Sequence, residues 1–154
     1  MAEIFMGDRV TRIVLADDHA RVRAGIKKIL ENQPDFVVVG EASDGMEAIT
    51  LVEKLSPDIL LLDMEMPVMS GGQVASFLKG KSSQVKVLAV SAYDDWHYIM
   101  GMLEIGAAGY LTKEEVPEIL VQAIRGVARG ESGWVSRKIS SKISAQGRNG
   151  SDKE

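Results

Sequence analysis

The chain has no cysteine among its 154 residues. This absence excludes disulfide bonds, zinc sites built from thiolates, and enzymes that use a cysteine nucleophile. No run of apolar residues approaches the roughly 18 that a membrane span requires. Residues 1–9 also lack the basic start and the long apolar centre of a signal peptide. We therefore expect a protein of the reducing cytoplasm, without a membrane segment.

The sequence also lacks a strong excess of charge of either sign. It holds 18 Lys and Arg against 22 Asp and Glu, which gives a net charge of −4. The chain as a whole therefore shows no electrostatic signature of nucleic-acid binding. A short basic stretch, Arg137, Lys138 and Lys142, is more typical of a solvated linker. The length and the 45% hydrophobic content predict a single domain with an ordinary core.

Strand-like and helix-like segments alternate along the chain. Short apolar runs predict strands, and apolar residues at helical spacing follow each of them. The predicted strands are 13–16, 36–42, 59–62, 85–91 and a short strand within 106–111. The predicted helices cover roughly 22–30, 45–55, 73–79, the region of 99–103, and 116–128. This order predicts an α/β fold of the (βα)5 type, with a doubly wound parallel sheet of five strands.

The two ends of the chain differ in pattern from its centre. We expect residues 1–10 to be an N-terminal extension, residues 11–130 the folded domain, and residues 131–154 a linker or disordered tail. Within the tail, Val135, Ile139 and Ile143 keep a helical spacing that supports one short helix. From Ala145 onward the composition of Gly, Ser, Asn and charged residues is typical of disorder.

Three carboxylates stand at the ends of two predicted strands. Asp17 and Asp18 follow the first strand, and Asp63 follows the third. In a doubly wound sheet the functional site lies beyond the carboxyl ends of the strands, so these side chains should meet. Neighbouring carboxylates resist simultaneous ionisation unless a cation joins them. Hard oxygen ligands of this kind predict a magnesium site.

Two further side chains should reach the same edge of the sheet. Ser91 ends the fourth strand and Lys113 closely follows the fifth. The sequence contains no serine in a nucleophile elbow and no phosphate-binding P-loop. It does contain the groups needed to receive a phosphoryl group on a carboxylate: a nucleophilic Asp, a metal site, a hydroxyl and an ammonium.

These motifs resemble the receiver domain of bacterial two-component response regulators, over residues 11–129. The motifs that carry the resemblance are Asp17-Asp18, Asp63 with Met66-Pro67 and Gly71, Val90-Ser91-Ala92, and Gly109-Tyr110-Leu111-Thr112-Lys113. The segments 16–19, 22–26 and 106–110 are similar to the LuxR-type subfamily of nitrate-response and nodulation regulators, which carry a C-terminal helix-turn-helix DNA-binding domain. The resemblance implies a flavodoxin-like strand order of 2-1-3-4-5.

The resemblance also implies a phosphorylation site that depends on Mg²⁺. Asp63 would be the phosphoacceptor, modified by a sensor histidine kinase. Asp18 would bind the metal directly, Asp17 directly or through water, and Glu65 through its backbone carbonyl. The side chains of Glu65 and Tyr93 would stand at the rim, where the family tunes hydrolysis of the acyl phosphate.

The same resemblance implies a conformational switch. Lys113 would pair with Asp63 before phosphoryl transfer and with the phosphoryl group afterwards. Ser91 would follow the phosphoryl group, and Tyr110 would turn inward as Ser91 moves. This change would alter the face made by the predicted fourth helix, fifth strand and fifth helix, with a homodimer as one possible product. DNA would be bound only through an output domain outside this chain.

Two residues near the site have competing interpretations. Glu114 follows Lys113 where many receivers have a proline joined by a cis bond, and a non-proline cis bond costs about 2.5–4 kcal/mol. The sequence therefore does not predict a cis bond between Lys113 and Glu114. His19 adjoins two acids, but its place at a predicted helix start favours a role other than metal binding.

Other functions stay open at the level of the sequence. The chain could be a fragment of a longer transcription regulator or a stand-alone receiver, and the subfamily resemblance favours the fragment. A haloacid-dehalogenase-type phosphatase would also use an Asp nucleophile, but its usual second acid is only loosely matched by Asp63-Met64-Glu65. A pseudo-receiver that acts as a scaffold is disfavoured because all five site residues are present.

Overall fold

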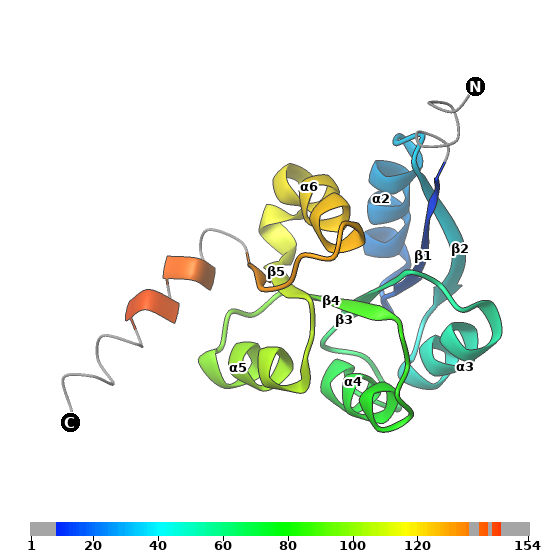
Figure 1. The fold of residues 1–154 in the computed structure, drawn as a ribbon. Helices are drawn as coiled ribbons and strands as arrows, with labels where there is room; N and C mark the ends of the chain where they lie inside the picture. The colour runs from blue at the N-terminus through cyan, green and yellow to red at the C-terminus, as the bar shows by residue number, and fades with distance from the viewer. Residues whose placement is uncertain (1–8, 136–138, 142, 146–154) are drawn as a thin grey trace.

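The computed structural model describes residues 9–135, 139–141 and 143–145 (Figure 1). Strands and helices alternate as predicted. In chain order the elements are β1 (Thr11–Ala16), α2 (Ala20–Glu31), β2 (Phe36–Ala42), α3 (Gly45–Leu55), β3 (Ile59–Asp63), α4 (Gly71–Gly80), β4 (Lys86–Ser91), α5 (Trp96–Ile105), β5 (Gly109–Thr112), the 3-10 turn η1 (Lys113–Glu115), α6 (Val116–Ala128) and β6 (Trp134–Val135).

The sheet is parallel throughout and has the strand order β2-β1-β3-β4-β5-β6. This order confirms the predicted α/β class and the flavodoxin-like arrangement of the first five strands. Strand β3 is buried along its whole length, as expected for a central strand whose two faces are covered by helices. The site residues that follow β1, β3, β4 and β5 therefore share one edge of the sheet.

The sixth strand was not predicted. We expected residues 131–154 to form a linker or tail, but Trp134–Val135 pairs with β5 in parallel. The Trp134 N–H donates to the Ala108 carbonyl at 3.0 Å, which fixes the register of this pair. A strand of two residues is too short to show the alternating pattern from which strands are predicted.

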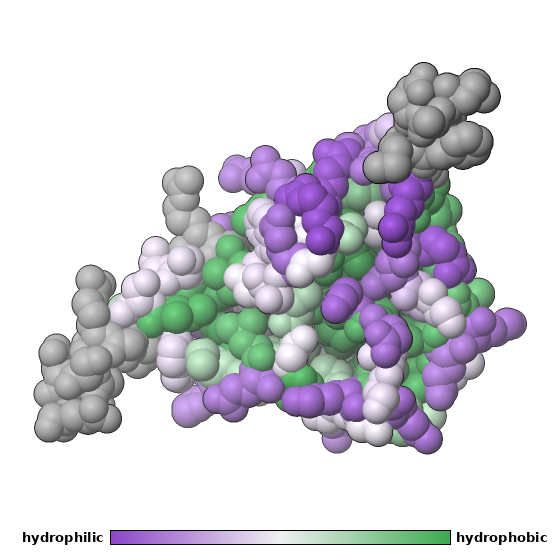
Figure 2. All heavy atoms as spheres, in the orientation of Figure 1, coloured by the Kyte–Doolittle hydropathy of each residue, from purple (hydrophilic) through white to green (hydrophobic). Residues whose placement is uncertain are grey.

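Helices cover both faces of the sheet (Figure 1). Helices α2 and α6 pack on one face, in a cluster that includes Leu30 and Leu120. Helices α3, α4 and α5 pack on the other, in a cluster that includes Val52, Leu78 and Ile99. Figure 2 shows hydrophilic side chains around the outside of the helices, with hydrophobic side chains visible between the two helical layers.

Polar side chains begin three of the helices. The Asp44 carboxylate caps α3 by accepting from the Glu47 N–H at 2.9 Å. Ser70 and Gln73 form a reciprocal capping box, which starts α4 before the predicted residue 73. Asp95 caps α5. These caps fix where each helix leaves the loop that follows a strand.

The segment after β6 differs from the single short helix that we predicted. Val135 lies in β6, whereas residues 139–141 and 143–145 are helical. The Ile139 side chain is fully buried in the same cluster as Ile99, Met102 and Tyr110. The segment therefore packs on the α5 side of the sheet. The predicted N-terminal extension up to residue 8, the basic residues Arg137, Lys138 and Lys142, and the predicted disorder of 146–154 lie outside the described residues.

A cleft opens at the end of the sheet where the strands begin. It is lined by residues that include Arg9, Asp58, Lys86 and Arg125, and it contains none of the three predicted site carboxylates. Among the described residues, the helices are too short or too polar to span a bilayer.

Candidate functional site

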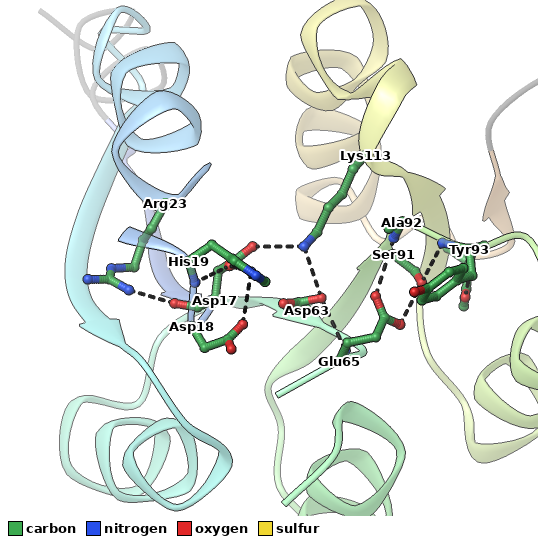
Figure 3. Close-up of polar contacts among 11 residues, drawn as sticks. Asp17, Asp18, His19, Arg23, Asp63, Glu65, Ser91, Ala92, Tyr93 and Lys113 are labelled. Atoms are coloured by element: carbon green, nitrogen blue, oxygen red, sulfur yellow. Dashed lines mark hydrogen bonds and ion pairs between the residues drawn. The ribbon is translucent and has the colours of Figure 1, made fainter. Parts of the chain in front are cut away.

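The three predicted carboxylates meet at the carboxyl edge of the sheet (Figure 3). Strands β1 and β3 are hydrogen-bonded neighbours, so the residues that end them lie side by side. One oxygen each from Asp17, Asp18 and Asp63, and one nitrogen of His19, lie within 4.8 Å of one another. Asp17 and Asp63 are each only 1% exposed, whereas Asp18 faces solvent. Two acids are thus held away from water beside a third.

Lys113 supplies the positive charge within this group. Its Nζ atom lies 3.3 Å from Asp63 Oδ1 and 3.3 Å from Asp17 Oδ2. Burial lowers the pKa of Lys113, but the charges of Asp63 and Asp17 outweigh burial and hold this pKa above its ordinary value. Lys113 is therefore a permanent ammonium that bridges the two buried carboxylates.

Asp63 is incompletely partnered. Its Oδ1 accepts the Glu65 N–H at 3.1 Å, but its buried Oδ2 has no hydrogen-bond partner among the described residues. Burial raises the pKa of Asp63 to about 6, and the charge of Asp17 adds to this effect, while the Glu65 N–H and Lys113 oppose it. A buried acceptor without a partner is costly, and a cation at Oδ2 would remove that cost. The group of hard oxygen ligands therefore fits a divalent metal ion.

A chain of hydrogen bonds leads from the site toward β5. Ser91 is fully buried, and its hydroxyl donates to Glu65 Oε2 at 2.8 Å. The same hydroxyl oxygen accepts the Tyr93 N–H at 3.0 Å, and Tyr110 donates to the Tyr93 carbonyl at 3.2 Å. These bonds connect the rim of the site to the aromatic side chain of β5.

Tyr110 is already buried in this structure. None of its surface is exposed, and burial raises its pKa to about 12, so its hydroxyl stays protonated as a donor. From the resemblance to receiver domains, we expected Tyr110 to turn inward as Ser91 moves. The inward position is present here without a phosphoryl group, and a rotation between two positions stays a prediction.

Close backbone packing and one arginine position the acids. A side chain at Gly71 would collide with the Asp63 carbonyl and with Met64 Cα, each 2.8 Å from the position of its Cβ. This glycine lets α4 begin directly against the end of β3. Arg23 of α2 donates to the Asp17 carbonyl at 2.6 Å and pairs with Glu41. The loop that presents Asp17 is thereby tied to α2 and β2.

Some expectations at the site differ from the structure or stay predictions. Among the described residues there is no cis peptide bond, so Lys113 and Glu114 are joined in trans, and Lys113 opens the turn η1. The His19 Nδ1 lies 3.0 Å from Asp18 Oδ1, although the place of His19 at a predicted helix start favoured a role other than metal binding. Metal binding by the Glu65 carbonyl stays a prediction. Tyr93 is exposed, consistent with a rim position.

Sequence reasoning missed the contact between Glu65 and Ser91. The sequence placed both residues at the same edge of the sheet, but the bond depends on how the Glu65 side chain is turned. No sequence pattern reports that orientation. The role of Arg23 was missed for a similar reason, since it is one of several basic residues on α2.

A match to a known protein family identifies the family to which this chain belongs. The family model of the response regulator receiver domain matches residues 13–125. The chain is a response regulator receiver domain. This assignment confirms the resemblance found in the sequence, and it covers β1 to most of α6, including every predicted site residue.

Curated relatives of this receiver domain are named as transcriptional or response regulators. It is 42% identical over 119 residues to the transcriptional regulatory protein DegU of Brevibacillus brevis, covering 77% of this chain and 50% of DegU. It is 40% identical over 119 residues to the nitrate/nitrite response regulator NarL of Escherichia coli K12, covering 77% of this chain and 55% of NarL. The chain thus spans about half the length of the curated relatives it matches.

Solved structures share the fold of this receiver domain. The signal receiver domain of NarL from Mycobacterium tuberculosis superposes with a TM-score of 0.77 at 36% identity, covering 80% of this chain and 99% of that one. A LuxR-family two-component response regulator from Aurantimonas sp. SI85-9A1 superposes with a TM-score of 0.84 at 31% identity, covering 89% of this chain and 97% of that one.

Proposed function

We propose that this receiver domain accepts a phosphoryl group on Asp63 from the phosphohistidine of a sensor kinase. The observation that carries the proposal is the state of Asp63, which is buried, paired with Lys113, and left with one unpartnered oxygen beside two further acids. Mg²⁺ would be held by Asp17, Asp18 and Asp63, with the Glu65 backbone carbonyl as a further ligand. When bound, Mg²⁺ neutralises negative charge on the transferring oxygens.

The proposed transfer follows from the contacts of Asp63. An oxygen of its carboxylate forms the new bond to phosphorus as the bond between phosphorus and the donor nitrogen breaks. Lys113 stands 3.3 Å from Asp63 and offers a fixed positive charge to the oxygens of the transferring group. Because most of this chemistry is positioning and charge neutralisation, a small protein with few catalytic groups suffices. Self-catalysed transfer and hydrolysis are the only reactions we assign to it.

The signal would leave the site through the chain of hydrogen bonds from Ser91 to Tyr110. Ser91 would follow the phosphoryl group, and Tyr110 would respond through Tyr93. The surface that changes is formed by α5, β5 and α6. Such a change is a shift between two packings that is biased by local charge. After phosphorylation, this surface would be where two copies of the receiver form a homodimer.

The relatives suggest the wider role. Those with printed functions are named as transcriptional or nitrate/nitrite response regulators. We propose that this receiver belongs to a transcription regulator of the cytoplasm and that DNA is bound by an output domain, not by the receiver itself. The mild net charge of −4 supports the second part, because it offers no general attraction for phosphates.

Intact-mass measurement after incubation with acetyl phosphate and Mg²⁺ tests the acceptor. We expect one phosphoryl group on the wild-type chain and none on Asp63→Asn, which keeps the shape of the side chain without a nucleophilic oxygen anion. A label of equal amount on Asp63→Asn would contradict the assignment. Continuous turnover of a phosphate monoester without a stoichiometric label would indicate a phosphatase.

A further inference from the structure

The carboxylate of Glu65 already occupies the hydrogen-bond donors at the end of β4. Ser91 donates its hydroxyl to Glu65 Oε2 at 2.8 Å, and the Ala92 N–H approaches Oε1 at 3.4 Å (Figure 3). Both oxygens of one carboxylate are thus engaged by two successive residues. The Glu65 carboxylate therefore engages Ser91, the donor that the proposed function assigns to a phosphoryl group, together with the neighbouring Ala92 N–H.

Ser91 cannot serve both anions at once. A serine hydroxyl carries a single proton and can donate one hydrogen bond at a time. In this structure that proton is directed to Glu65. A phosphoryl group on Asp63 would bring further anionic acceptor oxygens to the same edge of the sheet, and two anions at short range repel each other. The bond between Ser91 and Glu65 must therefore break before Ser91 can bind the phosphoryl group.

We propose that Glu65 is a positioning residue whose carboxylate stands in for the phosphoryl group on Ser91 and Ala92 and must be displaced from them upon phosphorylation. This inference rests on the proposed function of Asp63. It assigns the Glu65 side chain a role distinct from the metal-binding role predicted for its backbone carbonyl. It also explains why Tyr110 is buried without a phosphoryl group, because Ser91 is already held by an anion.

The surroundings of Glu65 favour a side chain that can be displaced. Glu65 is only partly buried, so its carboxylate can move toward water. Among the described residues no ion pair holds it in place. Within the described part of the chain, its carboxylate accepts two hydrogen bonds, and one of them is long. Ser91, in contrast, has no exposed surface.

Beryllofluoride, an analogue of the phosphoryl group, tests the proposal when its affinity is measured at saturating Mg²⁺. Glu65→Ala removes the competing acceptor and should bind beryllofluoride about tenfold more tightly than wild type, as expected when a charge-assisted hydrogen bond no longer competes. Glu65→Gln keeps an acceptor but removes the charge, and its affinity should fall between the two.

Asp95→Asn is the matched control. It removes one carboxylate near the same edge of the sheet, close enough to act on Tyr110, and asparagine still caps α5. Its affinity for beryllofluoride should stay close to that of wild type. Equal affinities of Glu65→Ala and wild type would overturn the proposal, as would an equal gain from Asp95→Asn, which would indicate a general effect of charge.

A second measurement needs neither metal nor beryllofluoride. In the metal-free protein, Glu65→Ala should shift the backbone amide resonances of Ala92 and Tyr93 and the ring resonances of Tyr110, with little change at α2. Unchanged resonances at these residues would overturn the proposal. Absence of beryllofluoride binding in wild type would instead contradict the function proposed for Asp63, and the inference that rests on it. The two failures are therefore distinguishable.

Discussion

At the scale of single residues, Asp63 carries a charge that the fold disfavours. Its carboxylate is buried, and its pKa is raised to about 6 from an ordinary value of 3.8. Between these two values the folded chain binds a proton that the unfolded chain releases. Stability due to this group therefore falls as the pH rises from about 4 to 6 and stays reduced above that range. The nucleophile that we propose for phosphoryl transfer is therefore maintained at a cost in stability.

This cost gives a prediction for the metal-free protein. Asp63→Asn removes the charge and should raise the free energy of unfolding at pH 7 by about 3 kcal/mol. Near pH 4 the difference from wild type should largely disappear, because the wild-type carboxyl is then protonated. Urea unfolding of both proteins at several pH values measures it. A stabilisation that does not change between pH 4 and pH 7 would contradict the burial of a charge as its cause.

The acids of the site were predictable, and their detailed contacts were not. Asp17, Asp18 and Asp63 each follow a short apolar run, and parallel strands deliver such residues to one edge of the sheet. The bond from Ser91 to Glu65 depends on a side-chain rotamer, which no spacing in the sequence encodes. The inward position of Tyr110 likewise depends on a core cluster that includes residues distant in the sequence, such as Ile139.

At the scale of elements, β6 packs closely against β5 and α6 at glycine positions. A Cβ atom at Gly109 would collide with the Trp134 carbonyl oxygen, and a Cβ at Gly126 would collide with the Trp134 indole. The indole also donates to Glu131 at 2.9 Å. These glycines leave the space in which Trp134 lies against β5 and α6. The sequence shows them only as small residues, so the sixth strand could not be predicted from them.

Substitution of these glycines should displace β6 from its place beside β5 and α6. Gly109→Ala is expected to displace Trp134 and lower the free energy of unfolding by about 1–3 kcal/mol, the range for overpacking. In a Trp96→Phe background, the fluorescence of Trp134 should shift to longer wavelength as the indole meets water. Gly101→Ala in α5 is the matched control, because open space surrounds that position. It should leave Trp134 unchanged and stabilise the helix slightly.

An unchanged Trp134 emission in Gly109→Ala would show that the position of β6 does not depend on this close contact.

Prediction of the remaining elements from the sequence was more successful. Strand β3 was evident from an apolar run that ends in Asp63, and α6 was predicted with the bounds that it has. Helix α4 was predicted two residues late, although Ser70 and Gln73 have the spacing of a capping box and could have shown its start.

At the scale of the whole molecule, binding of Mg²⁺ at the proposed site should raise global stability. Any ion that binds the folded chain but not the unfolded chain raises the free energy of unfolding by mass action. Adding Mg²⁺ should therefore raise the melting temperature of the wild-type protein, and removing it with a chelator should reverse the change. The effect should be lost in Asp18→Asn, which removes an exposed ligand with little disturbance of the core.

Thermal unfolding at several Mg²⁺ concentrations measures this coupling, and calcium serves as a control for the identity of the ion. An equal response of wild type and Asp18→Asn would indicate that the ion acts elsewhere. At this scale the resemblance to receiver domains predicted the order of the first five strands, which the structure confirms. The edge where the site forms was predicted from the alternation of strands and helices, because the functional site of a doubly wound sheet lies beyond the carboxyl ends of its strands.

The central claim, that phosphate is accepted by the Asp63 carboxylate, is tested most directly by locating the modified residue. Borohydride reduces an acyl phosphate to an alcohol, so treatment of the phosphorylated protein converts the acceptor aspartate into homoserine. Peptide mass mapping should then find homoserine at position 63 and nowhere else. Homoserine at position 17 or 18, or phosphate retained on a serine after reduction, would contradict the account.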